Sequence, residues 1–370
     1  MKPLRIGLVG LHDHYHAIPF ADEIQKSIEG IELVAVADEQ EWLVKDWAEK
    51  RGLDWTTDPM ALIARTDIDA VILTSSAAAY IDQVEAAAAL GKHVLLDKPI
   101  STTLADADRV VSASRKVKVL VAYLLRFVPS YVEARDAMQK GAIGRLTSGF
   151  YSIRVPSQTS GAEGIDWSFG PIKARGHGLL DHGVHFTDFF RWFSGSEPAS
   201  VVATIGSPFC PEASPDDYGI ATYTLANGAT VTLESTRQSD TRDSFAPLSN
   251  PDRATVAGTK GEMEFHYQRS PQIEVNGTEE PWRRRRYADH VGQERYEDAY
   301  RNLLVEFRDI IAQNREPSPS AADGRAALEM MLAAYEAANT GSRVSFPYVG
   351  DRTERGEPNS NESGRAAAVS

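Results

Sequence analysis

The first third of the chain alternates short apolar runs with longer stretches whose apolar residues recur with a helical period. The apolar runs, which we predict to be strands, are Leu4–Val9, Ile31–Ala37, Ala70–Thr74, His93–Leu96 and Val117–Tyr123. The predicted helices between them are Ile18–Glu29, Glu41–Gly52, Tyr80–Leu90 and Leu104–Lys116. Continuous apolar strands joined by helices indicate a parallel sheet with helices on both faces. We therefore expect residues 1–124 to form a doubly wound, Rossmann-type α/β domain.

The pattern changes after Arg126, where hairpins replace the strand–helix alternation. Asn227-Gly228 separates two alternating runs, a strong hairpin signal. The predicted strands are Tyr218–Leu225, Ala229–Ser235, Ala254–Ala257 and Glu262–His266, and the helices are Pro129–Lys140, Arg295–Gln313 and Ala321–Asn339. Consecutive hairpins make an antiparallel sheet. Residues 125–347 should thus form an α+β domain with a large, mainly antiparallel open sheet, whereas residues 348–370 have little to bury and are expected to be disordered.

Composition and charge narrow the class of protein. The 370 residues carry a formal charge of −13, which would repel nucleic acid and acidic membranes. The single cysteine, Cys210, permits neither an internal disulfide nor a cysteine-based metal cluster. No apolar run approaches the about 20 residues that span a bilayer. We expect a cytoplasmic protein that binds neither nucleic acid nor membrane.

A cofactor site is predicted where the first strand meets the following helix. The strand carries Gly7 and runs into Gly10, and a helix N-terminus after such a turn can hold a pyrophosphate. The glycine pattern is incomplete, because His12 and Tyr15 stand where a G-x-G-x-x-G motif has its second and third glycines. Asp38 ends the second strand, where a carboxylate accepts both ribose hydroxyls and repels a 2′-phosphate, favouring NAD over NADP. Alone, Asp38 could equally begin a turn.

Two further segments could carry acid–base chemistry. Lys98 follows a parallel strand, at the sheet edge where ligands bind, and could polarise a substrate oxygen. Asp181 and His185 share one face of a predicted helix, where the carboxylate would orient the imidazole for proton abstraction. The alternatives without a catalytic role are that Lys98 is a solvated lysine before Pro99 and that His185 is a half-buried histidine on a structural helix.

In combination, these motifs resemble the glucose–fructose oxidoreductase/inositol dehydrogenase (Gfo/Idh/MocA) family. The likeness runs from about Leu4 to Pro347. The segments that carry it are Ala89–Pro99 (A-L-G-K-H-V-L-L-D-K-P), Arg126–Pro129, Gly141–Gly144, Asp181–His185, Gly258–Gly261 and Thr340–Pro347. The resemblance implies a nucleotide-binding domain, a C-terminal α+β domain whose open sheet makes homo-oligomer contacts, and hydride transfer between NAD(P) and a sugar or polyol.

The resemblance also implies roles for single residues. Lys98 would be the catalytic lysine, and His185 the acid–base residue with Asp181 supporting it. Further cofactor contacts would come from His12, Thr74, Ser75, Asp97 and Lys98. Asp97 stands where the family usually has Glu. Substrate contacts would come from Arg126, Trp167 and Arg175.

Three functions remain open from the sequence. The first is an NAD-dependent oxidoreductase acting on a secondary alcohol of a sugar, cyclitol or related polyol. The second is a glycoside-cleaving enzyme that oxidises a ring hydroxyl, eliminates the aglycone and returns the hydride, so that no net NADH forms. The third is a sensor or scaffold that has lost turnover, an interpretation that His12 and Tyr15 favour and that Lys98, Asp181 and His185 oppose.

Two other clusters are given bland interpretations. His12, His14 and His16 suggest a metal site, but alternate residues entering a helix do not converge on one point, so we expect no metal. The run Arg283–Arg286 is interpreted as a solvated strand or loop edge, with a docking patch as the smaller possibility.

Overall fold

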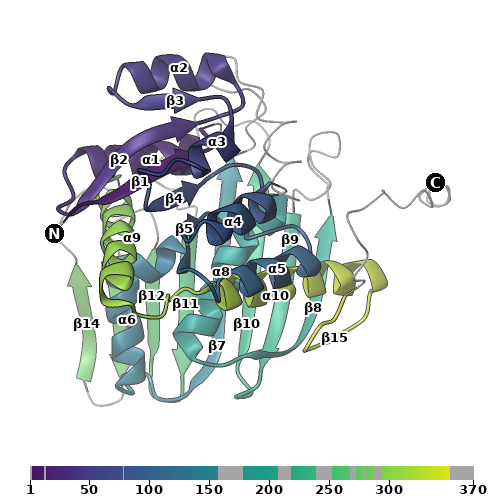
Figure 1. The fold of residues 1–370 in the computed structure, drawn as a ribbon. Coiled ribbons are helices and arrows are strands. Elements are labelled where there is room, and N and C mark those ends of the chain that lie inside the picture. Colours follow the sequence, from purple (N-terminus) through teal and green to yellow (C-terminus); the bar gives the residue numbers. More distant parts are fainter. Residues whose placement is uncertain are drawn as a thin grey trace.

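A computed structural model describes most of the chain. The described residues are 2–11, 14–77, 79–156, 178–206, 218–238, 252–266, 272–277, 280–286 and 293–350. They form a parallel sheet with its helices and, beside it, a larger second sheet (Figure 1). In these ranges, no helix is both long and apolar enough to cross a membrane.

The first sheet is parallel throughout, with strand order β3-β2-β1-β4-β5-β6. Its strands are β1 (Leu4–Val9), β2 (Ile31–Ala37), β3 (Asp54–Thr56), β4 (Ala70–Leu73), β5 (His93–Leu96) and β6 (Val119–Val121). Its helices are α1 (His14–Gln25), α2 (Glu41–Glu49), α3 (Pro59–Ile63), α4 (Tyr80–Ala89) and α5 (Leu104–Ala113). This order reverses direction between β1 and β4, the point where such sheets bind dinucleotides. The predicted Rossmann-type fold is confirmed.

The second sheet has the order β12-β11-β7-β10-β9-β8-β15. Its strands are β7 (Leu146–Pro156), β8 (Pro198–Gly206), β9 (Tyr218–Leu225), β10 (Thr230–Gln238), β11 (Asp252–Gly258), β12 (Glu262–His266) and β15 (Val344–Ser345). Only β7 and β10 pair in parallel among these described strands, so the prediction of a mainly antiparallel sheet is confirmed. A separate hairpin joins β13 (Gln272–Gly277) to β14 (Glu280–Arg286), and the run Arg283–Arg286 lies on β14.

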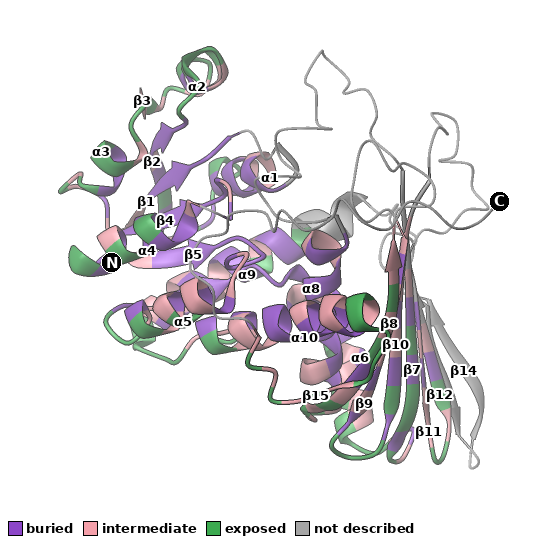
Figure 2. Ribbon diagram, turned by 90° about the vertical axis from the view of Figure 1, so that its right-hand side faces the viewer, coloured by how far each residue is buried: buried purple, intermediate pink, exposed green. Residues whose placement is uncertain are grey.

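Helices cover one face of the second sheet (Figure 2). They are α6 (Pro129–Gln139), which follows the short 3₁₀ helix η1 (Leu124–Phe127), α8 (Gly178–Ser194) and α10 (Ala321–Thr340). Gly183 allows α8 to lie close to α10, since a Cβ there would stand 2.5 Å from the Met331 side chain. Tyr151 of β7 packs against Phe186 and Phe189 of α8. These contacts fix the helix that carries Asp181 and His185.

The end of the chain returns to the first sheet. Helix α9 (Gln293–Gln313) packs on α1, where Tyr300 meets Phe20 edge-on at 4.8 Å between ring centroids. The Val121 N–H donates to the Pro319 carbonyl at 3.1 Å, so the segment before α10 pairs with the outer edge of β6. The boundary predicted after residue 124 stays a prediction.

Three expectations need comment. Helix α1 begins at His14, not near Ile18, and runs through Pro19. Strand β6 spans only Val119–Val121 of the predicted Val117–Tyr123, and η1 begins at Leu124. Of the predicted disordered tail, residues 348–350 are described and hold a contact in which the Tyr348 N–H donates to Glu329 at 2.6 Å, whereas residues 351–370 lie outside the described ranges.

Candidate active site

The turn after β1 requires a glycine at position 10. Gly10 has φ +96°, and a Cβ there would lie 2.4 Å from the Ser75 backbone nitrogen. The Thr74 hydroxyl donates to the Gly10 carbonyl at 2.6 Å, which joins the loops after β1 and β4. Gly7 has a packing reason of its own, since a Cβ there would stand 2.5 Å from the Leu62 side chain of α3. A cofactor role for Gly7 stays a prediction.

Asp38 lies where a dinucleotide's ribose is expected. It is 4% exposed, and its carboxylate accepts from the Leu11 N–H at 2.7 Å and the Gln40 N–H at 2.9 Å. These bonds hold it at the carboxyl end of β2, beside the Gly10 turn and the start of α1. A carboxylate, a glycine turn and a helix N-terminus at a reversal of strand order fit an NAD molecule. Nearby, the Ser75 hydroxyl donates to Gln83 at 2.7 Å.

Lys98 and Asp181 meet although they come from different domains. The Lys98 ammonium donates to Asp181 Oδ1 at 2.8 Å and to the Asp181 carbonyl at 3.2 Å. Their side chains are 3% and 14% exposed, so the pair is largely shielded from water. Lys98 follows β5, and Asp181 lies in the first turn of α8. The sheet edge and the helix predicted to act together are thus in contact.

His185 lies one turn further along α8. The residue is half-buried, and its Nδ1 is buried and has no hydrogen-bond partner among the described residues. Burial, and then the Lys98 charge, hold the pKa of His185 well below its ordinary value. The imidazole is therefore neutral near pH 7 and able to accept a proton. Among the described contacts, His185 donates no hydrogen bond to Asp181, whose carboxylate accepts from Lys98 instead. The Asp181 charge still favours the protonated imidazole.

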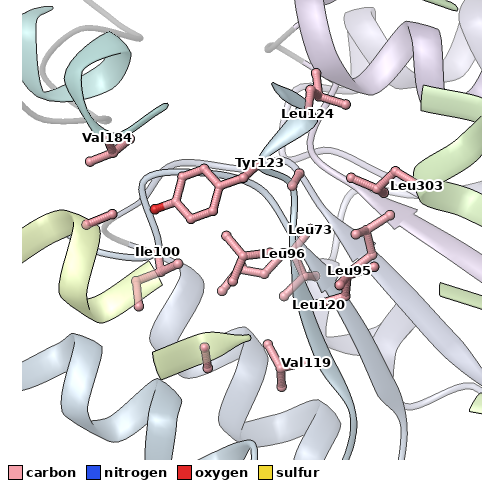
Figure 3. Packing of buried hydrophobic residues seen from close by; sticks show 14 of the residues in the cluster. Leu73, Leu95, Leu96, Ile100, Val119, Leu120, Tyr123, Leu124, Val184 and Leu303 are labelled. Carbon is pink, nitrogen blue, oxygen red and sulfur yellow. The ribbon is translucent and has the colours of Figure 1, made fainter. Parts of the chain in front are cut away.

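Sequence reasoning missed three neighbours of this site. His16 Nδ1 lies 2.7 and 2.8 Å from the two oxygens of Asp97, which also accepts from the Lys98 N–H at 2.8 Å. Tyr123 is fully buried and approaches the His185 ring edge-on, with centroids 6.1 Å apart. Figure 3 shows Tyr123 among the apolar residues of the first sheet.

The Tyr123 hydroxyl has no hydrogen-bond partner in the part of the chain that the structure describes. Tyr80 begins α4 and is also buried. Burial, followed by the charges of Asp97 and Asp181, raises the pKa of Tyr80. No local sequence motif marks these residues, because their partners are distant along the chain.

Arg126 lies in a buried ion pair. Its guanidinium donates to both oxygens of Asp188, at 2.6 and 2.8 Å, and lies 3.2 Å from Asp323. This pairing gives Arg126 a structural role between η1, α8 and α10, and its predicted substrate contact stays a prediction. The other expected contacts, His12, Trp167 and Arg175, lie outside the described residues.

Two features do not belong to the Lys98 site. An open hollow of about 550 Å³ between α6 and α9 is lined by Pro129, Glu133 and Asn302 but by neither Lys98 nor His185. Within the described ranges, no group of three or more His, Cys, Asp or Glu side chains could hold a metal ion.

Comparison with known proteins identifies the family. Residues 4–124 match the model of the oxidoreductase family with an NAD-binding Rossmann fold, and residues 131–264 match the GFO/IDH/MocA C-terminal domain. The chain belongs to the Gfo/Idh/MocA family. This Gfo/Idh/MocA protein is therefore an NAD-binding oxidoreductase.

Individual relatives cover nearly the whole protein. It is 30% identical to inositol 2-dehydrogenase of Rhizobium meliloti over 85% of this chain and 91% of the relative. It is 28% identical to myo-inositol 2-dehydrogenase of Thermotoga maritima over 90% and 95%. The crystal structure of a putative myo-inositol dehydrogenase from Sinorhizobium meliloti superposes with a TM-score of 0.75 at 27% identity, covering 92% of this chain and 99% of that one. A levoglucosan dehydrogenase complex with NADH and levoglucosan shares the fold, with a TM-score of 0.81 at 24% identity over 94% and 100%.

Proposed function

We propose that this Gfo/Idh/MocA protein is a cytoplasmic, NAD-preferring dehydrogenase or reductase that acts on a secondary alcohol of a sugar, cyclitol or related polyol. The observation that carries the proposal is the Lys98–Asp181 ion pair, with a neutral His185 one helical turn away. These three groups provide a cation, its counter-ion and a proton acceptor beside the expected nicotinamide end of the cleft. The inositol dehydrogenases among its relatives support the substrate class.

The residues divide the work as follows. Bound NAD supplies the acceptor for the hydride. His185 takes the hydroxyl proton, and the Lys98 ammonium stabilises the negative charge that develops on the substrate oxygen. Asp181 holds Lys98 in place and keeps that buried ammonium paired while the substrate is absent. In the reverse direction, the protonated His185 returns its proton to the alkoxide.

The first experiment measures NAD and NADP binding by calorimetry, followed by a polyol panel monitored by NADH absorbance. We expect NAD binding and turnover of at least one cyclitol or sugar. His185→Ala should abolish turnover and leave NAD affinity nearly unchanged, because the imidazole acts on the substrate. Equal loss of both would show that its role is misplaced.

Other outcomes identify the alternative functions. Cleavage of a glycoside panel without net NADH would replace the dehydrogenase with the oxidation–elimination–reduction enzyme. Binding of neither nucleotide would refute the proposal and favour a sensor or scaffold.

We also propose a homo-oligomer that forms through the second sheet. The face opposite α8 and α10 carries a row of uncharged side chains that are paired in register, namely Val202, Thr222, Thr232, Phe150 and Thr255. Phe150 and Val202 are 38% and 39% exposed. A row of uncharged, partly exposed side chains across a sheet face suits a copy of itself. Light scattering should show a dimer or larger, and Phe150→Asp should lower the mass; a monomer in the unaltered protein would refute this.

A further inference from the structure

A buried His–Asp pair links helix α1 to the end of strand β5. His16 and Asp97 are 6% and 1% exposed, and the imidazole Nδ1 contacts both carboxylate oxygens at 2.7 and 2.8 Å. Neither residue has a role in the proton transfer described above. Burying such a carboxylate is costly unless donors hold it. A function for the pair should therefore use the position or the charge of Asp97.

The pair joins the two halves of the dinucleotide site. His16 lies in the first turn of α1, the helix that follows the Gly10 turn, whereas Asp97 ends β5. Strand β4 separates β1 from β5 in the sheet, so the contact crosses the switch point. The carboxyl ends of β4 and β5 belong to the second mononucleotide half, where the nicotinamide falls. His16 thus connects the pyrophosphate helix to the nicotinamide side.

Within the described residues, the Asp97 carboxylate lies next to an ion pair whose charges are balanced. The Lys98 ammonium is paired with Asp181, and these two charges cancel. His185 on α8 is neutral because burial lowers its pKa. From α9, Tyr300 faces His16 with ring centroids 6.4 Å apart. A carboxylate beside a nicotinamide ring favours the cationic, oxidised ring over the neutral, reduced one.

We propose that His16 is a positioning residue that orients the Asp97 carboxylate, and that the pair biases the site toward NAD⁺ relative to NADH. The His16 imidazole and the Lys98 N–H contact the Asp97 carboxylate from two directions and fix its orientation. Without His16, the carboxylate loses one of these contacts, and the bias toward NAD⁺ falls. This inference rests on NAD binding and is independent of the substrate.

The test measures the dissociation constants of NAD⁺ and NADH directly, by calorimetry, at pH 7.5. His16→Leu removes the donor, Asp97→Asn removes the charge, and His16→Asn keeps an N–H near the position of Nδ1. We expect the ratio Kd(NADH)/Kd(NAD⁺) to fall about tenfold in His16→Leu and in Asp97→Asn, equivalent to about 1.4 kcal/mol. His16→Asn should retain most of the ratio.

Phe20→Leu is the matched control, since Phe20 shares the Tyr300 contact with His16 but does not touch Asp97. It should change stability and leave the ratio unchanged. An unchanged ratio in folded Asp97→Asn, an equal fall in Phe20→Leu, or the absence of nucleotide binding by the unaltered protein would each overturn the inference. Expected ratios in a protein that oxidises no polyol would leave the pair's role intact and refute only the proposed substrate class.

Discussion

Replacing Arg126 with Met tests whether this residue belongs to the fold or to the substrate site. The substitution leaves the Asp188 carboxylate, which is 0% exposed, without its hydrogen-bond donor. Asp323 is affected less, because its carboxylate keeps two other partners. Arg191 lies 3.4 Å away, and the Ser320 hydroxyl donates a hydrogen bond to it. The penalty therefore falls on Asp188.

The loss of stability in Arg126→Met is limited by protonation of Asp188, which removes the unpaired buried charge. Breaking a buried ion pair typically costs about 3–5 kcal/mol. Protonation sets an upper limit, because neutralising a carboxyl with the ordinary pKa of 3.8 costs about 4.4 kcal/mol at pH 7. At pH 5 the same step costs only about 1.6 kcal/mol. Burial raises the pKa of Asp188 even with Arg126 present. Without Arg126, Asp188 should therefore be protonated in the folded protein, and the loss of stability should reach the cost of that protonation.

The pH dependence of the deficit follows from the raised pKa of Asp188 in the variant. In Arg126→Met, the folded pKa of Asp188 lies above its unfolded value. The variant's deficit is therefore largest at neutral pH and shrinks as pH falls toward 5.

Urea denaturation of both proteins at pH 7 and pH 5 measures this deficit. We expect about 4 kcal/mol at pH 7, less than half of that at pH 5, and substantial recovery in Arg126→Met/Asp188→Asn. A stability deficit below about 1 kcal/mol at pH 7, or one independent of pH, would refute this reasoning. If the variant also showed a raised KM for its substrate, Arg126 would belong to the substrate site.

Three further predictions concern the cofactor loop and His185. Between pH 7.5 and 5.5, the unaltered protein should lose up to about 1.4 kcal/mol more stability than His185→Gln, because the pKa of His185 in the folded state lies below its ordinary 6.5 and the imidazole binds a proton on unfolding. Equal pH dependence of the two proteins in urea titrations would contradict this. Gly10→Ala should unfold at lower temperature and lose NAD affinity, whereas Gly141→Ala, at φ +82° in open space, should show only the backbone strain of about 1–2 kcal/mol. Asp38→Ala should weaken NAD binding and narrow its preference over NADP in calorimetry, and an unchanged preference would remove Asp38 from the ribose site.

Sequence reasoning located the elements with clear local boundaries. Strands Leu4–Val9, Tyr218–Leu225 and Glu262–His266 were predictable to the residue, because glycines or turn residues bound them. The start of α1 was not, since His14 and Tyr15 have modest helix propensity and Pro19 argues against a helix.

The candidate site divides in the same way. The positions of Lys98 and Asp181 follow from local motifs, and the structure brings the two side chains together. The partner of Asp97 is 81 residues away and that of Arg126 is 62 residues away. Such pairings depend on how helices dock, so a pattern along the chain cannot specify them. The counter-ions of Arg126, Asp188 and Asp323, could not be identified from the sequence for the same reason.

The return of the chain to β6 means that the first domain is contiguous in sequence but not self-sufficient in space. The segment around Pro319 occupies the outer edge of β6, and α9 covers α1. A fragment that ends after β6 would expose an unprotected strand edge and the apolar side of a helix, both of which promote aggregation. During synthesis, the edge of β6 and the outer side of α1 therefore stay uncovered until the last part of the chain has been made. Circular permutation that places α9 and α10 before β1 would remove that delay.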